Sequence, residues 1–166
     1  EANDGETVPE FEDTLFGFSD EVKSLIDRAS KLRGPDPKFE AFCKVVRDKQ
    51  RLPNNKLLVF STFRHTLKYL LKMTVGEPVR VGIIHGDIPD DERRDLRQRF
   101  SLGRDDPKAL DLLFSSEVGC EGLDFQFCDG LVNYDLPWNP MRVEQRIGRI
   151  DRYGQKSETV AIYNFI

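Results

Sequence analysis

The sequence predicts an α/β fold, with a mainly parallel sheet covered by helices on both faces. Two observations indicate this class. From residue 56 onward, short and continuously apolar segments alternate with segments of helical periodicity. Such apolar runs are typical of strands buried on both faces, as in parallel sheets. The length of 166 residues and the hydrophobic share of 39% fit one globular domain or slightly more.

Two helices are predicted before this alternation begins. Residues 19–34 start with a serine that can cap a helix and end at Gly34, which can stop it. Residues 35–50 place two phenylalanines and two valines on one face, so this helix is expected to pack on the domain. The Leu-Pro-Asn-Asn segment at 52–55 then breaks the helical pattern.

Five strands and three further helices follow in alternation. The strands are predicted at 56–61, 79–85, 109–116, 131–135 and 160–166, and the helices at 62–74, 89–101 and 139–154, with a glycine-containing loop at 117–130. In open α/β sheets, ligands bind at the carboxyl ends of the strands. A site is therefore expected in the loops that follow Ser61, His85, Ser116 and Asp135.

The acidic residues are unevenly distributed. Residues 1–21 hold eight acids and no Lys or Arg, whereas the rest of the chain holds all 25 basic residues and 21 of the 29 acids. The net charge of −4 therefore hides a mildly basic domain and does not exclude nucleic-acid binding. We interpret residues 1–19 as an acidic tail or linker, either leading from another lobe or autoinhibitory, and residues 20–35 as a helical lead-in.

Several classes of protein are excluded by composition. No apolar run approaches the ~18 residues of a membrane helix, and no secretory signal opens the chain. Three cysteines and two histidines at no metal-ligand spacing predict reduced thiols, no metal site and a cytoplasmic protein.

Because the chain begins at Glu1 without Met and ends on an apolar segment, we expect it to be a piece of a longer protein.

Arginine is concentrated in the segment EQRIGRIDRYGQ at 144–155. Asn139 can cap the predicted helix, Pro140 suits its first position and Gly154 can end it. Arginines at helical spacing often belong to a solvated face that pairs with nearby acids, and this alternative stays open.

A helical wheel divides this segment into two faces. At about 100° per residue, one apolar face of ~60° holds Val143, Ile147 and Ile150. The opposite face, also ~60° wide and without an acid, holds Gln145, Arg149 and Arg152. Paired guanidiniums beyond the carboxyl end of a strand suit a phosphate-like anion.

The loop after the third predicted strand is a second candidate. Gly119 and Gly122 allow close approach of the backbone to a ligand. Ser115 and Ser116 offer hydroxyl groups, and Asp124 could accept a hydrogen bond from a ribose hydroxyl. The alternative is a loop with ordinary turn glycines.

A third candidate combines the loops STFRHT at 61–66 and HGD at 85–87. Each supplies small polar residues and a basic or imidazole side chain just after a strand. The alternatives are a helix N-cap by Ser61 or Thr62, and His85 as a polar residue satisfied within the protein.

Together and in this order, these segments resemble the second RecA-like lobe of a superfamily 2 helicase-type ATPase. LLVFSTFRHT resembles motif IV, VGIIHGD the strand and loop that follow it, SSEVGCEGLDFQFCDGLVNYDLPWNP motif V with its extension, and EQRIGRIDRYGQ motif VI. WNP at 138–140 and RYGQ at 152–155 resemble the Snf2 group of double-stranded DNA translocases, in particular its bacterial, RNA-polymerase-associated members. The resemblance covers residues 36–166 and implies a RecA-like (P-loop NTPase-like) lobe, cut short at its C-terminal end.

The resemblance also implies roles for individual residues. Arg149 and Arg152 resemble the arginine fingers that reach the γ-phosphate of ATP. Nucleotide-binding positions are matched by Gly122, Asp124 and Gln145. Positions that face the nucleic-acid backbone are matched by Ser61, Thr62, Arg64, His85, Gly86, Ser115 and Ser116.

Two positions depart from the chromatin branch of the family, and the phosphate-binding loop of a first lobe is absent. Asp151 stands where chromatin remodellers usually have His, and Asp124 where they have Asn, so that branch is not implied. No G-x-x-x-x-G-K-[ST] motif is present, and DDER at 90–93 opens a predicted helix rather than following a strand. The resemblance therefore implies half of an active site, with ATP and Mg²⁺ held by an N-terminal RecA-like lobe of the same protein.

The implied function is that of a second motor lobe in an ATP-dependent translocase. Its expected partners are the N-terminal lobe, double-stranded DNA, and RNA polymerase or another protein complex in the bacterial cytoplasm. Two alternatives remain at this point, namely a lobe of a strand-separating superfamily 2 helicase and a non-catalytic docking domain with a RecA-like fold.

Overall fold

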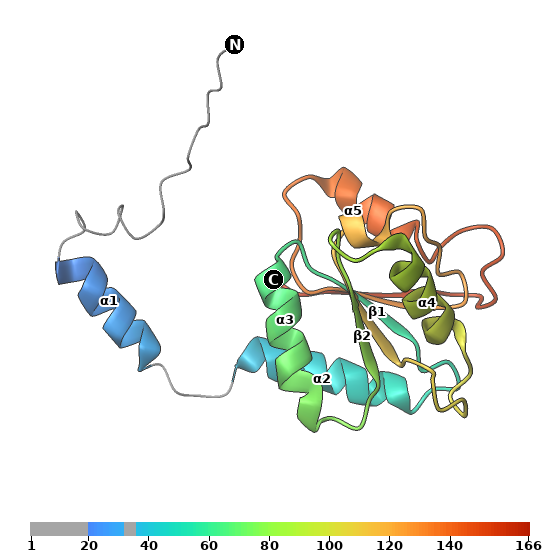
Figure 1. Cartoon of the computed structure of the whole chain (residues 1–166), viewed down its shortest axis with the longest axis horizontal. Coiled ribbons are helices and arrows are strands. Elements are labelled where there is room, and N and C mark those ends of the chain that lie inside the picture. Colours follow the sequence, from blue (N-terminus) through green and yellow to red (C-terminus); the bar gives the residue numbers. More distant parts are fainter. Residues whose placement is uncertain (1–19, 32–35) are drawn as a thin grey trace, which may run out of the picture. The chain divides into compact units, whose positions relative to one another are not determined.

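The computed structural model describes residues 20–31 and 36–166 and divides the chain into two units, Glu1–Asp36 and Pro37–Ile166 (Figure 1). In the first unit, the predicted helix is present as α1 (Asp20–Ser30). The predicted acidic tail lies outside the described residues.

The second unit is built on a five-stranded parallel sheet. Its strands are β1 (Leu57–Phe60), β2 (Val81–Ile84), β3 (Leu112–Ser115), β4 (Gly130–Asn133) and β5 (Ala161–Asn164), in the spatial order β2-β3-β1-β4-β5. Every neighbouring pair is parallel. The residues of β1, β3 and β4 are all buried, which explains their continuously apolar sequences. The prediction of an α/β fold with a parallel sheet is confirmed.

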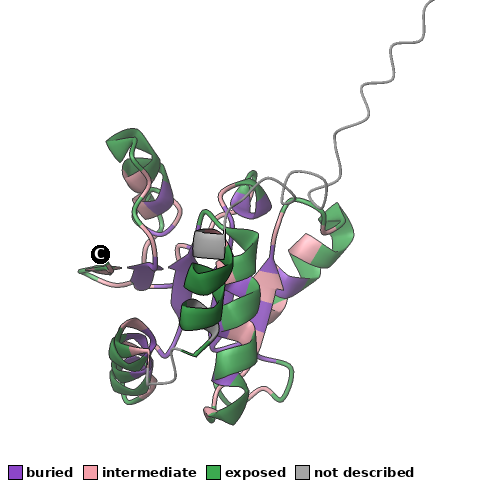
Figure 2. Ribbon diagram, turned by 90° about the vertical axis from the view of Figure 1, so that its left-hand side faces the viewer, coloured by how far each residue is buried: buried purple, intermediate pink, exposed green. Residues whose placement is uncertain are grey.

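Helices cover both faces of this sheet (Figure 1). One core cluster joins α2 (Pro37–Gln50) and α3 (Arg64–Met73) to the sheet, and a second joins α4 (Asp90–Ser101) and the segment after β3 to the opposite face. Short 3₁₀ turns occupy Thr74–Gly76 and Val118–Cys120. Figure 2 shows the buried strands between helices whose outer faces are exposed. No helix in residues 20–31 or 36–166 has the length and apolar character needed to cross a membrane.

The arginine-bearing helix is shorter than predicted. Helix α5 (Pro140–Ile147) ends with Gly148 at its C-cap, not with Gly154. Beyond it, the N–H groups of Arg149 and Ile150 donate to the carbonyls three residues earlier, as in a 3₁₀ turn. A central glycine weakens a helix, and the Arg149 carbonyl accepts a hydrogen bond from Phe125 N at 2.9 Å, which favours leaving the helix here.

A closed polar network lies at the amino ends of the strands. The Asp111 carboxylate accepts hydrogen bonds from Asn55 Nδ2 at 2.6 Å, from Arg80 Nη2 at 2.7 Å, and from Arg80 Nε and backbone N at 2.9 Å each. Burial acts to raise the pKa of Asp111, but these hydrogen bonds outweigh it and hold the pKa below its ordinary value of 3.8. The charged form of Asp111 therefore stabilises the fold.

This network predicts an acid-sensitive contribution to stability. Asp111→Asn should lower the free energy of unfolding at pH 7 by roughly 1.5–3 kcal/mol, because hydrogen bonds to a charged group are lost. Since the folded pKa lies below the unfolded one, the contribution is present above pH 3.8 and is lost as the pH falls through the folded pKa. Urea denaturation across a pH series should show that the free energies of unfolding of Asp111→Asn and of the unmodified protein converge in acid. Asp105→Asn, at an exposed position, is the control. If the stability difference between Asp111→Asn and the unmodified protein did not change with pH, the charged form of Asp111 would not be the source of the stability.

Candidate functional site

The candidate site lies at the carboxyl ends of the three central strands. The register places Phe60 of β1 beside Ser115 of β3 on one side and Asn133 of β4 on the other. Backbone hydrogen bonds continue this alignment past the strand ends, from Ser61 N to Ser115 O at 3.1 Å and from Tyr134 N to Phe60 O at 2.9 Å. The loops that follow these three strands therefore meet at one edge, as predicted.

The guanidinium of Arg146, in α5, is the centre of this edge. Its side chain is 1% exposed. Nε and Nη2 donate to Glu117 Oε1 at 3.1 and 2.7 Å, and Nη2 also donates to Thr62 Oγ1 at 3.1 Å. Nη1 donates to Asn133 Oδ1 at 3.0 Å and to the Asp135 carbonyl at 2.8 Å. All five N–H donors of the group are thus used.

A buried arginine is stable only with such compensation. Removing a cation from water costs several kcal/mol unless opposite charge and hydrogen bonds replace the solvent. Glu117 supplies the nearest negative charge, the Asp135 carboxylate lies 3.7 Å away, and the Phe60 ring lies 5.4 Å from the guanidinium. Because the partners come from the ends of β1, β3 and β4, Arg146 ties the three loops together.

The Asp135 carboxylate provides a second link between the loops. It accepts hydrogen bonds from the Ser61 hydroxyl and, at 2.8 Å, from the backbone N–H of Thr62. The loop after β1 is therefore held to the loop after β4 by Asp135 as well as by Arg146.

Sequence reasoning counted Arg146 in the arginine cluster but gave it no role. A signal was available, because at about 100° per residue Arg146 falls only ~40° from Ile150 and ~60° from Val143, beside the apolar face. An arginine at that position must be buried with partners or extend past the edge of the core. Its four hydrogen-bond partners, Thr62, Glu117, Asn133 and Asp135, come from distant segments, and no local pattern identifies them.

Arg149 lies beside Arg146, at a pocket of about 50 Å³. The pocket is lined by Phe60, Glu117, Glu121, Gln145, Arg146 and Arg149. Arg149 is half-buried, and its side chain makes one long hydrogen bond, from Nη1 to Leu123 O at 3.3 Å. The pocket brings together Gln145 and Arg149, as the helical wheel predicted, and two glutamates from the loop after β3 also line it.

Arg152 is not brought into this pocket. Its side chain is exposed and makes no hydrogen bond or ion pair with any residue that the structure describes. The prediction that Arg149 and Arg152 share a helical face is wrong, because α5 ends at Ile147, before either arginine.

The glycine loop after β3 contains an exposed glycine, Gly122, and an aspartate, Asp124, that is already hydrogen-bonded within the protein. Gly122 adopts a positive φ of 75°, is exposed, and has no atom within 4 Å of where a Cβ would lie. The Asp124 carboxylate instead accepts from Arg97 Nη2 at 2.5 Å, and its backbone carbonyl accepts from Arg97 Nε at 2.9 Å. A ribose hydroxyl would thus compete with Arg97 for Asp124.

The predicted nucleic-acid residues divide into buried and exposed groups. The Ser61 and Ser115 side chains are fully buried, and Ser115 Oγ donates to Ser116 O at 2.8 Å and contacts Cys120 Sγ at 2.7 Å. Ser116 Oγ accepts from Gly119 N at 3.1 Å. These hydroxyls hold the loops together rather than facing solvent. Burial raises the pKa of the Cys120 thiol to about 12, so the thiol is protonated at neutral pH.

The other members of this set lie at the surface. Thr62, Arg64 and Gly86 are exposed, and Arg64 forms an ion pair of 2.5 Å with Asp87. His85 is half-buried, and its Nδ1 is buried without a hydrogen-bond partner among the described residues.

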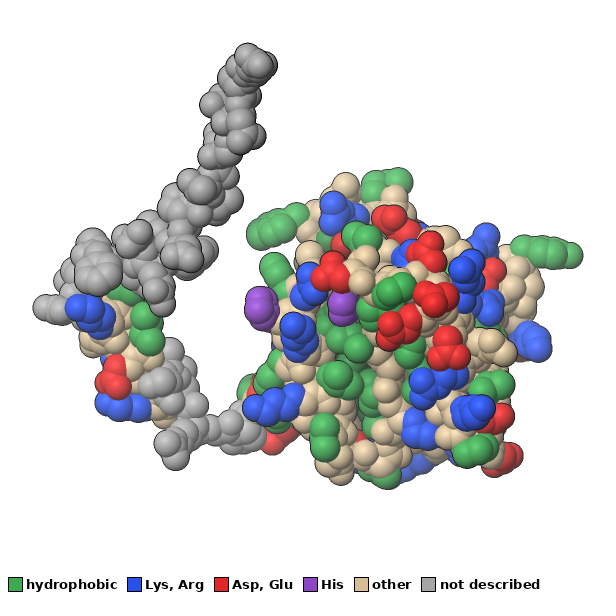
Figure 3. Space-filling view, viewed as in Figure 1, with side chains coloured by type: hydrophobic (Ala, Val, Ile, Leu, Met, Phe, Trp, Pro, Cys, Tyr) green, Lys and Arg blue, Asp and Glu red, His purple; other side chains and the backbone are tan. Residues whose placement is uncertain are grey.

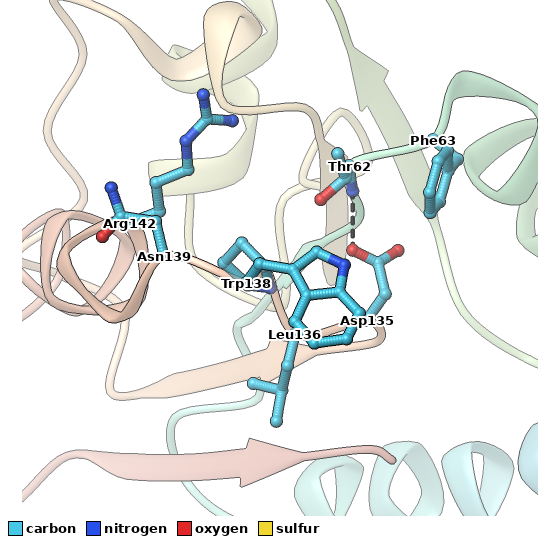
Figure 4. A pocket seen from close by; sticks show the side chains of 8 residues that line it. Thr62, Phe63, Asp135, Leu136, Trp138, Asn139 and Arg142 are labelled. Carbon is cyan, nitrogen blue, oxygen red and sulfur yellow. Dashed lines mark hydrogen bonds between the residues drawn. The ribbon is translucent and has the colours of Figure 1, made fainter.

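A larger pocket, of about 370 Å³, opens beside the site (Figure 4). It is lined by Thr62, Phe63, Asp135, Leu136, Pro137, Trp138, Asn139 and Arg142. Phe63 is 63% exposed and Trp138 is fully exposed, although both are large apolar residues. From the sequence, Trp138 was used only to support the family resemblance. Its place in the loop between the end of a strand and the helix cap Asn139 already indicated an exposed side chain.

Comparison with known proteins identifies relatives of this lobe. The model of the helicase conserved C-terminal domain matches residues 37–154. An uncharacterized ATP-dependent helicase, YqhH of Bacillus subtilis, is 34% identical over 150 residues, 87% of this chain and 24% of its own. The ATP-dependent RNA helicase RhlB of Shewanella frigidimarina is 31% identical over 75% of this chain and 29% of its own. The RNA polymerase-associated protein RapA of Pectobacterium atrosepticum is 37% identical over 54% of this chain and 9% of its own.

Solved structures show the same fold. The C-terminal part of the Fun30 ATPase domain matches 93% of this chain and 52% of its own, with a TM-score of 0.71 and 20% identity. Domain 2 of the DEAD-box helicase Mss116p, solved with an RNA duplex, matches 77% of this chain and 49% of its own, with a TM-score of 0.60 and 23% identity. The predicted RecA-like lobe is thereby confirmed. The chain spans less than a third of the length of the relatives named above.

The buried guanidinium predicts a large effect on stability. Arg146→Met keeps much of the side-chain volume but leaves the buried Asn133 Oδ1 without its donor and the partly exposed Glu117 paired with Arg142, so the free energy of unfolding should fall by about 1–3 kcal/mol. Urea denaturation of the 166-residue chain measures this loss. Arg152→Met, at an exposed position without partners, should change it by no more than about 0.5 kcal/mol. Equal stabilities of the two variants would contradict the central role of Arg146.

Proposed function

The chain belongs to the helicase conserved C-terminal domain family, and from this premise we propose that it is the second motor lobe of an ATP-dependent, Snf2-type double-stranded DNA translocase. The observation that carries this proposal is the half-buried Arg149 at the carboxyl edge, beside the anchored Arg146. A guanidinium in that position can stabilise the charge that develops on a transferred phosphoryl group.

The backbone of Arg149 is held while its side chain is only weakly engaged. Arg149 N donates to Arg146 O at 3.1 Å, and Arg149 O accepts from Phe125 N at 2.9 Å. Its one side-chain hydrogen bond, at 3.3 Å, is to a neutral carbonyl. A phosphate oxygen is a stronger acceptor for a guanidinium than a carbonyl, so exchange on closure is favourable. We assign Arg149 as the principal arginine finger and Arg152, which is exposed, as a second finger.

The described residues contain no cluster of metal ligands. No group of three or more His, Cys, Asp or Glu in its described part could hold a metal ion, and the sequence has no phosphate-binding loop motif. We therefore place the metal and the phosphate-binding lysine in an N-terminal RecA-like lobe of the same protein. In this scheme Gln145, Gly122 and Asp124 would face the nucleotide across the cleft between the lobes.

The nucleic acid would lie over the exposed part of the same edge. Thr62, Arg64 and Gly86 are accessible, and His85 has an unpartnered ring nitrogen. The buried serines, Ser61, Ser115 and Ser116, would act by holding these loops in place. A partner protein such as RNA polymerase is proposed from the likeness to RapA.

The main alternative is a strand-separating helicase. RhlB bears the name of an RNA helicase, and the Mss116p domain was solved with an RNA duplex, so this alternative has support from relatives. A non-catalytic docking domain is less well supported, because it would have no need for an arginine beside the pocket or for a second one nearby.

A direct comparison of the two motor activities separates these proposals. The full-length protein should displace a third strand from a DNA triplex in an ATP-dependent manner, without separating the strands of a duplex. Tracking along a duplex requires phosphate contacts that do not depend on unpaired bases. Strand separation without triplex displacement would favour the helicase alternative.

The finger assignment predicts a specific kinetic defect. In the full-length protein, Arg149→Ala should lower the maximal ATP turnover by about 10³-fold or more, which corresponds to at least ~4 kcal/mol of barrier. ATP affinity, measured by nucleotide titration, should be nearly unchanged, because the phosphates are held by the other lobe.

Two control experiments accompany this measurement of ATP turnover. Arg51→Ala removes an exposed arginine near the amino ends of the strands, whose one ion pair among the described residues is with Asp48, and should leave turnover unchanged. The isolated 166-residue chain should show no DNA-stimulated turnover. Turnover by that chain, or an unaffected Arg149→Ala enzyme, would disprove the half-site assignment.

A further inference from the structure

Helix α3 carries positive charge of which the described residues neutralise only a part, the Arg64 side chain. Its ten residues, RHTLKYLLKM, contain one Arg, two Lys and one His and no acid. Helix α4, of similar length, holds four Arg and four acids and is neutral. In Figure 3 basic side chains lie over α3 on the face in view. We name Arg64, His65, Lys68 and Lys72 the α3 basic stripe.

The stripe follows one side of the helix. At about 100° per residue, its four members span an arc of ~100°. All four are exposed, whereas Leu67 and Leu70 on another side of the helix are fully buried. Arg64 and Lys72 are eight residues apart, or about 12 Å along the axis at 1.5 Å per residue.

No internal interaction explains this placement. The side chains of His65, Lys68 and Lys72 make no ion pair or hydrogen bond within the described residues, and Arg64 pairs only with the exposed Asp87. Like charges four residues apart destabilise a helix by a few tenths of a kcal/mol per pair. Arg64 also stands in the first turn, where the helix dipole disfavours a cation. These two terms are slightly unfavourable unless an external anion binds, whereas Lys72, in the last turn, is favoured by the helix dipole.

We infer that the α3 basic stripe binds the phosphate backbone of duplex DNA. This inference rests on the proposed function and extends the DNA surface beyond the strand ends. Helix α3 begins directly after Thr62 and Phe63 at the site edge, so the stripe continues from the exposed residues already assigned to DNA. One DNA strand carries a phosphate about every 3.4 Å of helix axis, so a 12 Å stripe matches about three or four phosphates.

Salt dependence of DNA binding tests the inference. In the full-length protein, the double variant Lys68→Gln/Lys72→Gln should bind a duplex of fixed sequence more weakly. The slope of log Kd against log salt concentration should fall by about 0.9 for each lysine that contacts a phosphate. The variant Lys68→Arg/Lys72→Arg keeps both charges and should keep the slope.

A matched control removes two lysines elsewhere. Lys108 and Lys156 are exposed in the loops that lead into β3 and β5, at the opposite edge of the sheet. Lys108→Gln/Lys156→Gln should leave the slope unchanged. ATP turnover without DNA should be the same in all variants, which shows that the lobe remains folded.

Each outcome has a separate meaning. An unchanged slope for Lys68→Gln/Lys72→Gln overturns the inference and leaves the stripe to a protein partner or to solvent. A reduced slope on duplex RNA but not on duplex DNA overturns the choice of DNA. Failure of the unmodified protein to bind either duplex would instead contradict the proposed function.

Discussion

The ion pair between Arg146 and Glu117 is the interaction on which the carboxyl edge of the sheet depends. A desolvated guanidinium is stable only while every donor has an acceptor, and here those acceptors come from the ends of three different strands. None of the three loops can shift without leaving a buried charge partly unpaired. The geometry of the edge therefore depends on one side chain. Arg149 follows Arg146 by three residues and donates its backbone N–H to the Arg146 carbonyl, so its position depends on that of Arg146.

The three arginines of this segment consequently have different physical roles despite their even spacing. Arg146 is fully buried and saturated with partners, so it has no donor left for a ligand. Arg149 is half-buried with one long hydrogen bond, which suits exchange for a stronger acceptor. Arg152 is exposed and would have to be ordered by the ligand itself, at a cost in side-chain entropy. Unsatisfied donors, rather than the number of arginines, distinguish a phosphate-binding group from a structural one.

Sequence patterns predicted the features that depend on local periodicity. Continuous apolar runs such as Leu57–Phe60 identified the parallel strands, because strands buried on both faces have no polar alternation. The end of α5 was missed because apolar residues continue at helical spacing past Gly148, while the chain is drawn into a 3₁₀ turn by contact with Phe125. The burial of Ser61 and Ser115 was missed for a similar reason, since their acceptors lie in distant or sharply turned segments. Long-range hydrogen bonding decided the end of α5 and the burial of Ser61, whereas a sharp local turn decided that of Ser115.

The two ends of the strands differ in how their charge is balanced, and this difference indicates where ligands can act. At the amino ends, the buried Lys49 pairs with Asp129, and Arg80 and Asn55 enclose Asp111. These charges already form ion pairs and hydrogen bonds within the protein, so a ligand that binds there would have to replace those interactions. At the carboxyl ends Arg146 is saturated, while Arg149 and the neighbouring basic residues of α3 retain donors that no described residue uses. Anions gain most where desolvated or clustered cations still lack partners, which is why the proposed phosphate contacts are assigned to this edge.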